Sequence, residues 1–389
     1  KLRVSAGYTG TQNIGDNMFY TLYSPYAYGG TSAMVPTQLG NEAIRWESTL
    51  QKDAGLDLSL FNSRFGLTFE FYEKNTSGIL FTKTVAGSSS FNSIISNLAN
   101  IRNRGVEVSL RGDFMKKRDF NWNGAFNISF NRSLVTNVNR DFTNPENVEE
   151  FNLGNAIVRE GEPLGLIYGK VFEGLFKTQE EVDSYKEGNP YWSIFDPYLG
   201  IGDPKYKTVE GDPFPVNEII GYAEPKFYGG YTNTISYKGI SLMTLFTFSK
   251  GNDILYQGDI QNNNVSNRAN KTVQILDHWS EDNPNSERPR LLYGQNGTAY
   301  TNSGAVYDAS FLKLKSLSLS YNFPKIWTDK LNVAQATVFG SATNVLTWTK
   351  YPGVDPEVSN DPYSLINGAN DPGTFPAVRQ FTLGLRFIL

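Results

Sequence analysis

One long stretch of alternating residues constrains the fold of this chain more than any other feature. Residues 44–60 read IRWESTLQKDAGLDLSL, with mostly apolar side chains at even positions and mostly polar or charged ones at odd positions. Because a β-strand directs successive side chains to opposite faces, this pattern predicts a strand with one apolar and one charged face. At about 3.3 Å per residue the strand would extend roughly 55 Å, whereas about 9 to 11 residues of a tilted strand cross a bilayer. Strands of soluble proteins are much shorter, at about five or six residues.

The same period-two alternation recurs along the rest of the chain. Asn62-Ser63 and Lys238-Gly239 mark tight turns between successive strands, and the segment PKIWTDK joins a further pair. We count about eleven strands in all, which predicts an all-β, antiparallel fold. Besides 44–60 they are 2–9, 64–74, 105–114, 120–131, 163–176, two strands within 226–249, two within 312–344, and 381–389.

Long connections alternate with short turns in most places. The alternation fails once, between 163–176 and 226–249, where we expect a further strand that the pattern does not reveal. Loops longer than about 15 residues are uncommon in compact soluble domains, whereas transmembrane barrels combine short turns on one side with long loops on the other. The long connections are 10–43, 79–103, 133–162, 177–225, 250–308 and 345–377.

Composition excludes several other classes of protein. The chain has no cysteine, which removes disulfides and thiolate metal sites, and its net charge of -4 at pH 7 offers no basic surface to nucleic acid. No apolar run approaches the roughly 20 residues of a membrane-spanning helix, so a membrane role must rest on strands. The first residues, KLRVSAGYTG, alternate as a strand rather than forming a signal peptide. We therefore expect an exported protein that begins there to be a fragment or a mature remainder.

The charged face of the long strand requires water. Unpaired charges buried in a dry core would cost several kcal/mol each, so an apolar face in contact with lipid implies a large hydrated interior on the other side. A barrel that keeps these charges hydrated must be wide or filled by a polar plug. The residues predicted to line this lumen are Arg45, Glu47, Asp53, Asp57, Glu70, Glu107 and Arg111.

Phrases spread over nearly the whole chain carry a family resemblance. They include GNEAIRWESTLQKDAGLDLSLFNSRFGLTFEFYEKNTSGIL, NIRNRGVEVSL, FNWNGAFNISFNRSLV, EGEPLGLIYGKVFEGLF, AEPKFYGGYTNTISYKGISL, ATNVLTWTKYPGVDPEV and VRQFTLGLRFIL. Each phrase is a loose match by itself, but their order along the chain is that of one family. Together they resemble the SusC/RagA class of TonB-dependent outer-membrane transporters.

The resemblance implies a transmembrane antiparallel β-barrel of roughly 22 strands with an N-terminal plug inside it. It also implies energy supplied by the TonB complex and a SusD-like surface lipoprotein that closes the barrel as a lid. About eleven strands are half of such a barrel. We therefore expect residues 1–389 to be the C-terminal half of the barrel with its long extracellular loops, and the plug domain and TonB-contacting region to lie outside this chain.

One departure from the family pattern bears on metal binding. Where many relatives carry an Asp-rich loop after a Gly-Asp pair, this chain has GDPKYKTVEGDPFPVNEII. Asp203, Asp212 and Glu218 remain as candidate calcium ligands, but Pro213 and Pro215 interrupt a regular array of oxygen ligands. We expect no cofactor, with calcium in this loop as the alternative.

Two of the long connections are rich in aromatic side chains. Such rings stack on sugar faces or on peptide side chains while their polar atoms stay hydrated. The alternative is that they pack the loops against one another or against a partner. The candidate ligand-binding residues are Tyr20, Tyr23, Tyr26 and Tyr28 in one loop and Tyr191, Trp192 and Tyr198 in the other. Just before the second group, TQEEVDSYKEG predicts a short helix with Thr178 as its N-cap.

Nothing in the sequence marks a catalytic site. His278 is the only histidine and lies in an expected loop, which excludes a zinc site made of several histidines and leaves a lone base without a marked nucleophile. Carboxylates are plentiful, but no spacing singles out the pair that glycoside hydrolysis requires. No glycine-rich phosphate loop follows a strand and opens a helix. We therefore expect a transporter or binding protein rather than an enzyme.

Three functions remain open at this point. The first is TonB-dependent import of an oligosaccharide or oligopeptide across the bacterial outer membrane, together with a SusD-like lipoprotein. The second is a passive porin or adhesin with the same barrel. The third is a soluble all-β carbohydrate-binding protein, which would not require detergent for extraction.

Overall fold

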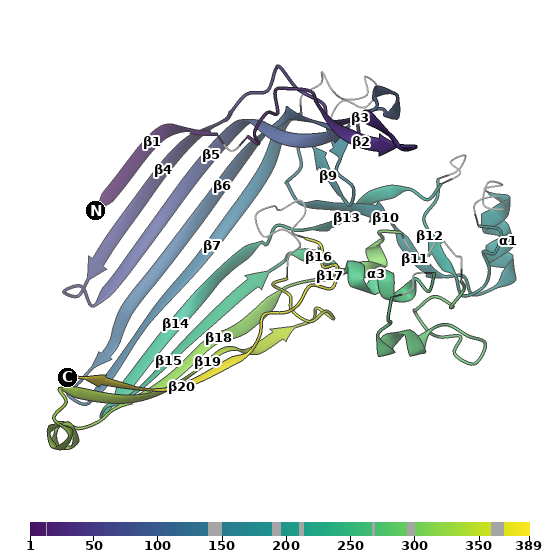
Figure 1. The fold of residues 1–389 in the computed structure, drawn as a ribbon. Coiled ribbons are helices and arrows are strands. Elements are labelled where there is room, and N and C mark those ends of the chain that lie inside the picture. Colours follow the sequence, from purple (N-terminus) through teal and green to yellow (C-terminus); the bar gives the residue numbers. More distant parts are fainter. Residues whose placement is uncertain are drawn as a thin grey trace.

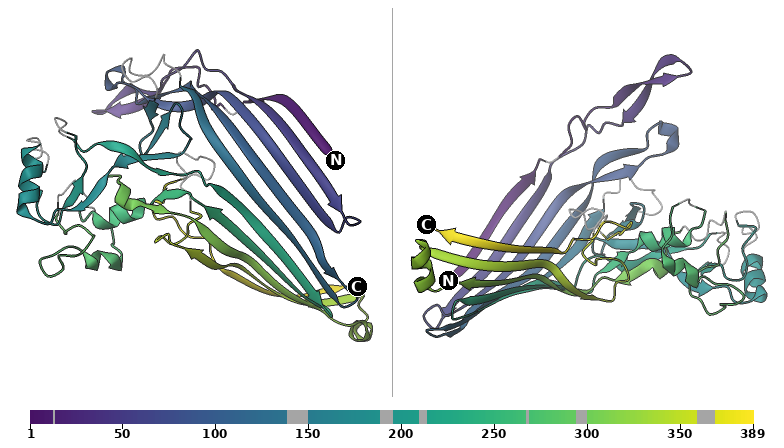
Figure 2. Two further views of the ribbon diagram at one scale, coloured as in Figure 1. Left: turned by 180° about the vertical axis from the view of Figure 1, so that it is seen from behind. Right: turned by 60° about the horizontal axis from the view of Figure 1, so that its bottom comes forward.

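A ten-stranded antiparallel sheet dominates the fold, and long connections gather at one end of it (Figure 1). The computed structural model describes residues 1–12, 14–138, 150–188, 196–209, 214–266, 269–293, 300–358 and 369–389. In spatial order the strands are β1 (Leu2–Thr11), β4 (Glu47–Leu60), β5 (Phe65–Thr84), β6 (Ser93–Lys116), β7 (Phe120–Val138), β14 (Phe227–Tyr237), β15 (Ile240–Lys250), β18 (Phe311–Asn322), β19 (Gln335–Thr349) and β20 (Gln380–Ile388). The sheet curves without closing, because β1 and β20 each have one neighbour among the described strands (Figures 1 and 2).

Connections at the loop end of this sheet are mostly long and those at its other end are short, although the β5–β6 connection at the loop end spans only residues 85–92. Strand β7 pairs directly with β14, so no strand is missing between them. The prediction of a barrel strand over 163–176 was wrong, as was the expectation of a further strand after it. This segment forms two short strands, β10 (Leu166–Lys170) and β11 (Phe172–Leu175), which pair within the loop end and not with the large sheet. Gly165, just before β10, has a φ of 78°, and Gly174, at an irregularity within β11, has a φ of 110°, so both depart from an extended path.

The predicted loop over 79–103 is mostly strand. Strand β5 continues to Thr84 and β6 begins at Ser93, which leaves a connection of residues 85–92. Leu98, Ala99 and Ile101 of β6 are buried in a cluster that also contains Phe151 and Val158 from the neighbouring connection. Because this part of β6 is covered by a second layer, it lacks the apolar and polar alternation on which the prediction depended.

The long connections contain small elements of their own. A four-stranded sheet has the order β13 (Asn217–Tyr222), β10, β9 (Ala156–Arg159) and β8 (Glu150–Asn152). Three further pairs of strands are β2 (Leu22–Tyr28) with β3 (Thr31–Gln38), β11 with β12 (Pro204–Tyr206), and β16 (Asp253–Leu255) with β17 (Val306–Asp308). The α-helices are α1 (Gln179–Glu187), α3 (Gln257–Asn263) and α4 (Lys325–Thr328), and the 3-10 turns are η1 (Gly87–Ser89), η3 (Val273–Asp277), η5 (Ser303–Ala305) and η6 (Asp329–Leu331). Throughout the described residues, no helix is long and apolar enough to cross a membrane.

The predicted short helix is confirmed as α1. Thr178 has an extended backbone, and its hydroxyl accepts a hydrogen bond from the Glu181 backbone N–H at 3.2 Å. The Glu181 carboxylate in turn accepts from the backbone N–H of Lys177 at 2.7 Å. The first bond satisfies an N–H that the first helical turn leaves unpaired, and the second satisfies the N–H of the residue before the N-cap.

Strand register keeps apolar residues together on one surface of the sheet. Leu56 lies opposite Leu2 on β1 and opposite Phe69 on β5. Phe69 lies opposite Val108, and Val108 opposite Ile128. We call the surface that carries this row the apolar face. Phe69 is 41% exposed and Leu2 is 75% exposed, so this face does not pack into a dry core.

The opposite surface carries the polar residues. Asp57 lies opposite Thr68, Thr68 opposite Ser109, Ser109 opposite Asn127, and Asn127 opposite Gly230. We call this surface the polar face. The buried apolar clusters of the described chain lie at the loop end of the molecule, where β8, β9, α1, α3 and their neighbours pack together.

Candidate functional site

Charged residues of β1, β4 and β5 form a connected network on the polar face. The Arg3 guanidinium donates to Asp57 at 2.9 Å and lies 3.6 Å from Glu70. Asp57 also accepts from the Thr68 hydroxyl at 3.2 Å. Four residues earlier on β4, Asp53 accepts from the Ser5 hydroxyl at 3.1 Å. Three of the residues predicted to line a lumen, Asp53, Asp57 and Glu70, therefore share one surface.

Two further residues of the predicted set extend this surface toward β7. Glu107 lies directly opposite Glu70, and Arg111 lies opposite Gly66. Asp57 and Arg111 belong to the lining of a hollow of about 800 Å³ that spans β4 to β7. Charges of both signs therefore lie in and around this hollow.

The two remaining residues of the predicted set lie at the loop end of β4. The Glu47 carboxylate accepts a hydrogen bond from the Leu80 backbone N–H at 3.0 Å, where β5 and β6 lose regular pairing. Arg45 precedes β4, and its backbone N–H and carbonyl are both bonded to the Asn97 side chain at 2.9 Å. Arg45 is thus positioned by its backbone, while its side chain is exposed.

A buried lysine attaches one long connection to the polar face. Lys313 of β18 is 1% exposed, and its ammonium donates to Asp355 at 2.8 Å and to Glu357 at 2.5 Å. Lys315 also donates to Glu357, at 2.7 Å. Burial acts to raise the pKa of Glu357, but hydrogen bonds from both lysines outweigh it and hold this pKa below its usual range. The segment after β19 is therefore held over the sheet by charge.

A second connection is attached to the polar face by hydrogen bonds to Glu224, just before β14. Its carboxylate accepts from the backbone N–H of Ser133 at 3.0 Å, from the Ser133 hydroxyl at 3.1 Å, and from the Asn131 amide at 2.7 Å. Both residues belong to the polar face of β7, and Asn131 also accepts from the Tyr72 hydroxyl at 2.9 Å. Two separate connections thus cover the polar face near its loop end. Sequence reasoning singled out neither Lys313 nor Glu224.

The predicted aromatic residues do not form one site. Tyr20 lies just before the β2–β3 hairpin, Tyr23, Tyr26 and Tyr28 lie on β2, and all four are more than half exposed. Tyr198 is 69% exposed and lies between α1 and β12. The hairpin and α1 lie on different sides of the loop end in every view of Figures 1 and 2. Tyr191 and Trp192 lie outside the described residues.

Two of the predicted calcium ligands are engaged by cations of the protein. Asp203 is fully buried and accepts from the Arg290 guanidinium at 2.5 and 2.7 Å and from the Gly200 N–H at 2.7 Å. Glu218 forms an ion pair with Lys207 at 2.6 Å. Asp212 lies outside the described residues. The described ranges contain no group of three or more acidic or histidine side chains that would hold a metal ion.

Comparison with known proteins identifies relatives over almost the whole chain. Residues 1–165 match the family model described as "TonB dependent receptor-like, beta-barrel". TonB-dependent receptor P3 of Formosa agariphila is 30% identical over 400 residues, which cover 99% of this chain and 39% of that protein. TonB-dependent receptor SusC of Bacteroides thetaiotaomicron is 26% identical over 407 residues, which cover 99% of this chain and 37% of that protein.

A solved structure shares the same fold. The structure titled "Structure of the RagAB peptide transporter" superposes with a TM-score of 0.76 at 24% identity, covering 99% of this chain and 40% of that one. The chain therefore spans about two fifths of the length of the relatives that it matches.

Proposed function

This chain belongs to the TonB-dependent receptor family of bacterial outer-membrane proteins, and from that premise we propose that it forms one wall of a conduit for the TonB-dependent import of an oligosaccharide or oligopeptide. The observation that carries the proposal is the separation of the sheet into a continuous apolar face and a continuous polar face. An exposed apolar face is stable against lipid, and a face with charges of both signs is stable against water. A wide aqueous interior satisfies both.

In this proposal the polar face lines the lumen. Glu47, Asp53, Asp57, Glu70, Glu107 and Arg111 would then contact the plug or the passing cargo, and Arg45 would lie at the outer mouth. The ion pairs of Arg3 with Asp57 and Glu70 support this assignment. All three side chains are partly exposed, so these charges remain in contact with water, as a hydrated lumen requires. The connections fixed by Lys313 and Glu224 would narrow the mouth from the extracellular side.

The proposal includes two partners outside this chain. A SusD-like surface lipoprotein would close the extracellular mouth, and the TonB complex would act through a region of the receptor outside this chain. The lipoprotein partner is supported by two names: RagAB for the transporter with the same fold, and SusC for a sequence relative. The family name supports the second partner, the TonB complex.

A passive porin is the competing function, and energy dependence separates the two. Uptake of the cargo by cells that carry the intact receptor should stop when TonB is deleted, while the amount of receptor in the outer membrane stays unchanged. A protonophore should have the same effect within minutes. Uptake that continues at the same rate in both cases would identify a passive pore and contradict the proposal. The soluble alternative does not fit a sheet whose apolar face is exposed along its length.

A further inference from the structure

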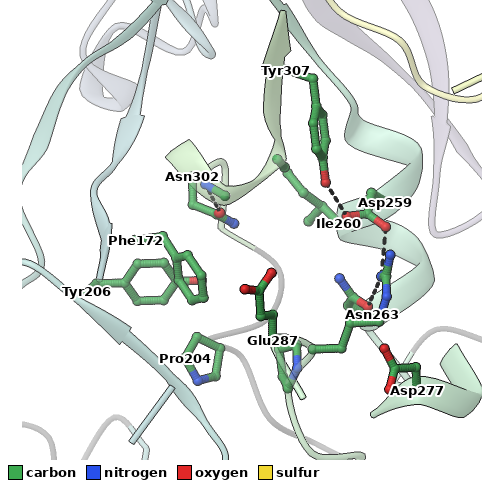
Figure 3. A pocket seen from close by; sticks show the side chains of 14 residues that line it. Phe172, Pro204, Tyr206, Asp259, Ile260, Asn263, Asp277, Glu287, Asn302 and Tyr307 are labelled. Carbon is green, nitrogen blue, oxygen red and sulfur yellow. Dashed lines mark hydrogen bonds and ion pairs between the residues drawn. The ribbon is translucent and has the colours of Figure 1, made fainter. Parts of the chain in front are cut away.

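A pocket of about 430 Å³ lies in the loop end of the molecule, and none of its lining residues belongs to the ten-stranded sheet (Figure 3). Its walls come from β11, β12, α3, η5, β17 and the segment that carries residues 287–289. Parts of the chain that are more than 100 residues apart therefore meet around one concavity. This volume lies within the roughly 300 to 1,000 Å³ of known ligand pockets, so the pocket can admit a long side chain of a larger ligand.

One wall of the pocket is apolar. The rings of Phe172 and Tyr206 meet edge to face, with their centroids 6.1 Å apart. Pro204 lies beside these two rings, and Ile260 and Ala305 add apolar surface elsewhere in the lining (Figure 3). The apolar wall offers contact surface for methylene groups and an aromatic ring for a cation.

The opposite wall is polar, but its charges cancel. The Arg288 guanidinium donates to Asp259 at 2.9 Å and to the Asn263 side-chain oxygen at 3.0 Å. The second oxygen of Asp259 accepts from the Tyr307 hydroxyl at 3.2 Å. Asp259 is 7% exposed and needs these partners. This network shapes the pocket, and its own charges cancel.

The carboxylate of Glu287 differs from that of Asp259 in having no partner among the described residues. In Figure 3 its carboxylate points into the space between the Phe172 and Tyr206 rings on one side and Asn263 on the other. Within the described part of the chain, no hydrogen bond or ion pair joins this carboxylate to another residue. Asp277, which also lines the pocket, adds a second negative charge, and its carboxylate accepts a hydrogen bond from the Asn283 amide at 3.0 Å. The pocket thus combines an apolar wall, an aromatic ring and an unpaired anion.

We propose that this pocket binds the side chain of a lysine in an oligopeptide cargo. The ammonium would meet the Glu287 carboxylate, and the methylene stem would lie along Phe172. A neutral sugar would leave the negative charges without a counter-charge, and an amino sugar has no methylene stem to cover the apolar wall. A metal ion is disfavoured because the described residues offer no group of three ligands. The inference rests on the proposed import function, since it names a feature of the cargo.

Binding to the intact receptor, purified in detergent, tests the inference. The probes are three capped pentapeptides, Gly-Gly-X-Gly-Gly, in which X is lysine, Nε-acetyl-lysine or norleucine. Calorimetry should give about tenfold tighter binding for the lysine peptide than for the other two, because they lack the charge that meets Glu287. Glu287→Gln should remove this difference. Glu281→Gln is the matched control, because Glu281 is an exposed acid of the same connection that does not line the pocket.

Equal binding of the three peptides to the unmodified receptor would overturn the inference, as would an equal loss with Glu281→Gln. A glucosamine oligomer that binds more tightly than the lysine peptide and depends on Glu287 would overturn the assignment to peptides. The assay requires no energy source, so it is independent of the TonB test. Charge-selective binding together with TonB-independent uptake would refute the import function and leave the lysine pocket standing.

Discussion

The Lys313 ammonium lies 2.8 Å from a carboxylate oxygen of Asp355, and this pair joins the wall of the sheet to the connection after β19. Both side chains are at least nine-tenths buried, and Glu357 supplies a second carboxylate at 2.5 Å. A lysine with so little access to water is stable as a cation only when such partners surround it. The buried Lys313 therefore anchors the connection to the strand, and Lys315 adds a more exposed contact to Glu357.

Replacement of the Lys313 charge should release the connection. Lys313→Met leaves Asp355 buried without a cation, and breaking a buried pair in this way costs about 3 to 5 kcal/mol. Limited proteolysis of the folded receptor should then cut within 350–358 at least ten times faster. Lys315→Met is the matched control, because Lys315 is 37% exposed and its pair should contribute less than about 1 kcal/mol. Equal protection in the two variants would contradict this account.

Acid should release the same connection. Because the two lysines hold the pKa of Glu357 below its ordinary value of 4.5, the folded protein stabilises the ionised carboxylate. This contribution is fully present above the ordinary pKa and is lost as the pH falls through the lowered one. Proteolysis with an acid-stable protease should therefore show constant protection down to about pH 5 and loss of protection below it. In Glu357→Gln this pH dependence should be smaller, and an unchanged profile would exclude Glu357 as its source.

The strands of the sheet could be predicted because water or lipid meets both of their faces. Strand β4, with Asp57 on one face and Leu56 on the other, keeps its alternation along most of its length. The pattern disappears where a second layer covers the sheet, as at Leu98 and Ile101, which are 1% and 2% exposed. In those places the tertiary contacts select the side chains, and periodicity carries no signal.

The placement of the candidate lumen residues could be predicted only where they belong to a strand pattern. Asp53, Asp57, Glu70, Glu107 and Arg111 follow from alternation and do share the polar face. Lys313 has its partner 42 residues away, and Glu224 contacts Ser133 across 91 residues. A single sequence contains no indication of such pairings, because they are created by the path of the connections.

Arg290 should hold in place the segment around Asp203, which was predicted to bind calcium. Arg290→Met leaves the fully buried Asp203 without its cation, at a cost of about 3 to 5 kcal/mol, and should loosen residues 196–206 toward proteolysis. Lys207→Met is the control, because its pair with Glu218 is 44% exposed on both sides. A chelator should leave the unmodified protein unchanged. If the chelator instead reproduced the effect of Arg290→Met, a bound cation rather than Arg290 would be holding this segment.

A changed charge on β4 should impair folding on the apolar face but not on the polar face. Leu56 belongs to the apolar face, and Leu56→Arg should cost about 2 to 4 kcal/mol near the middle of the membrane. Asp53, three residues earlier on the polar face, accepts hydrogen bonds from Ser5 and Gln51, and Asp53→Lys should change uptake with little loss of folding. Folded receptor in the outer membrane, measured by heat-dependent gel migration, should fall several-fold for Leu56→Arg only. Because lipid excludes charge and a hydrated lumen accepts it, the opposite ranking would mean that the sheet faces the other way.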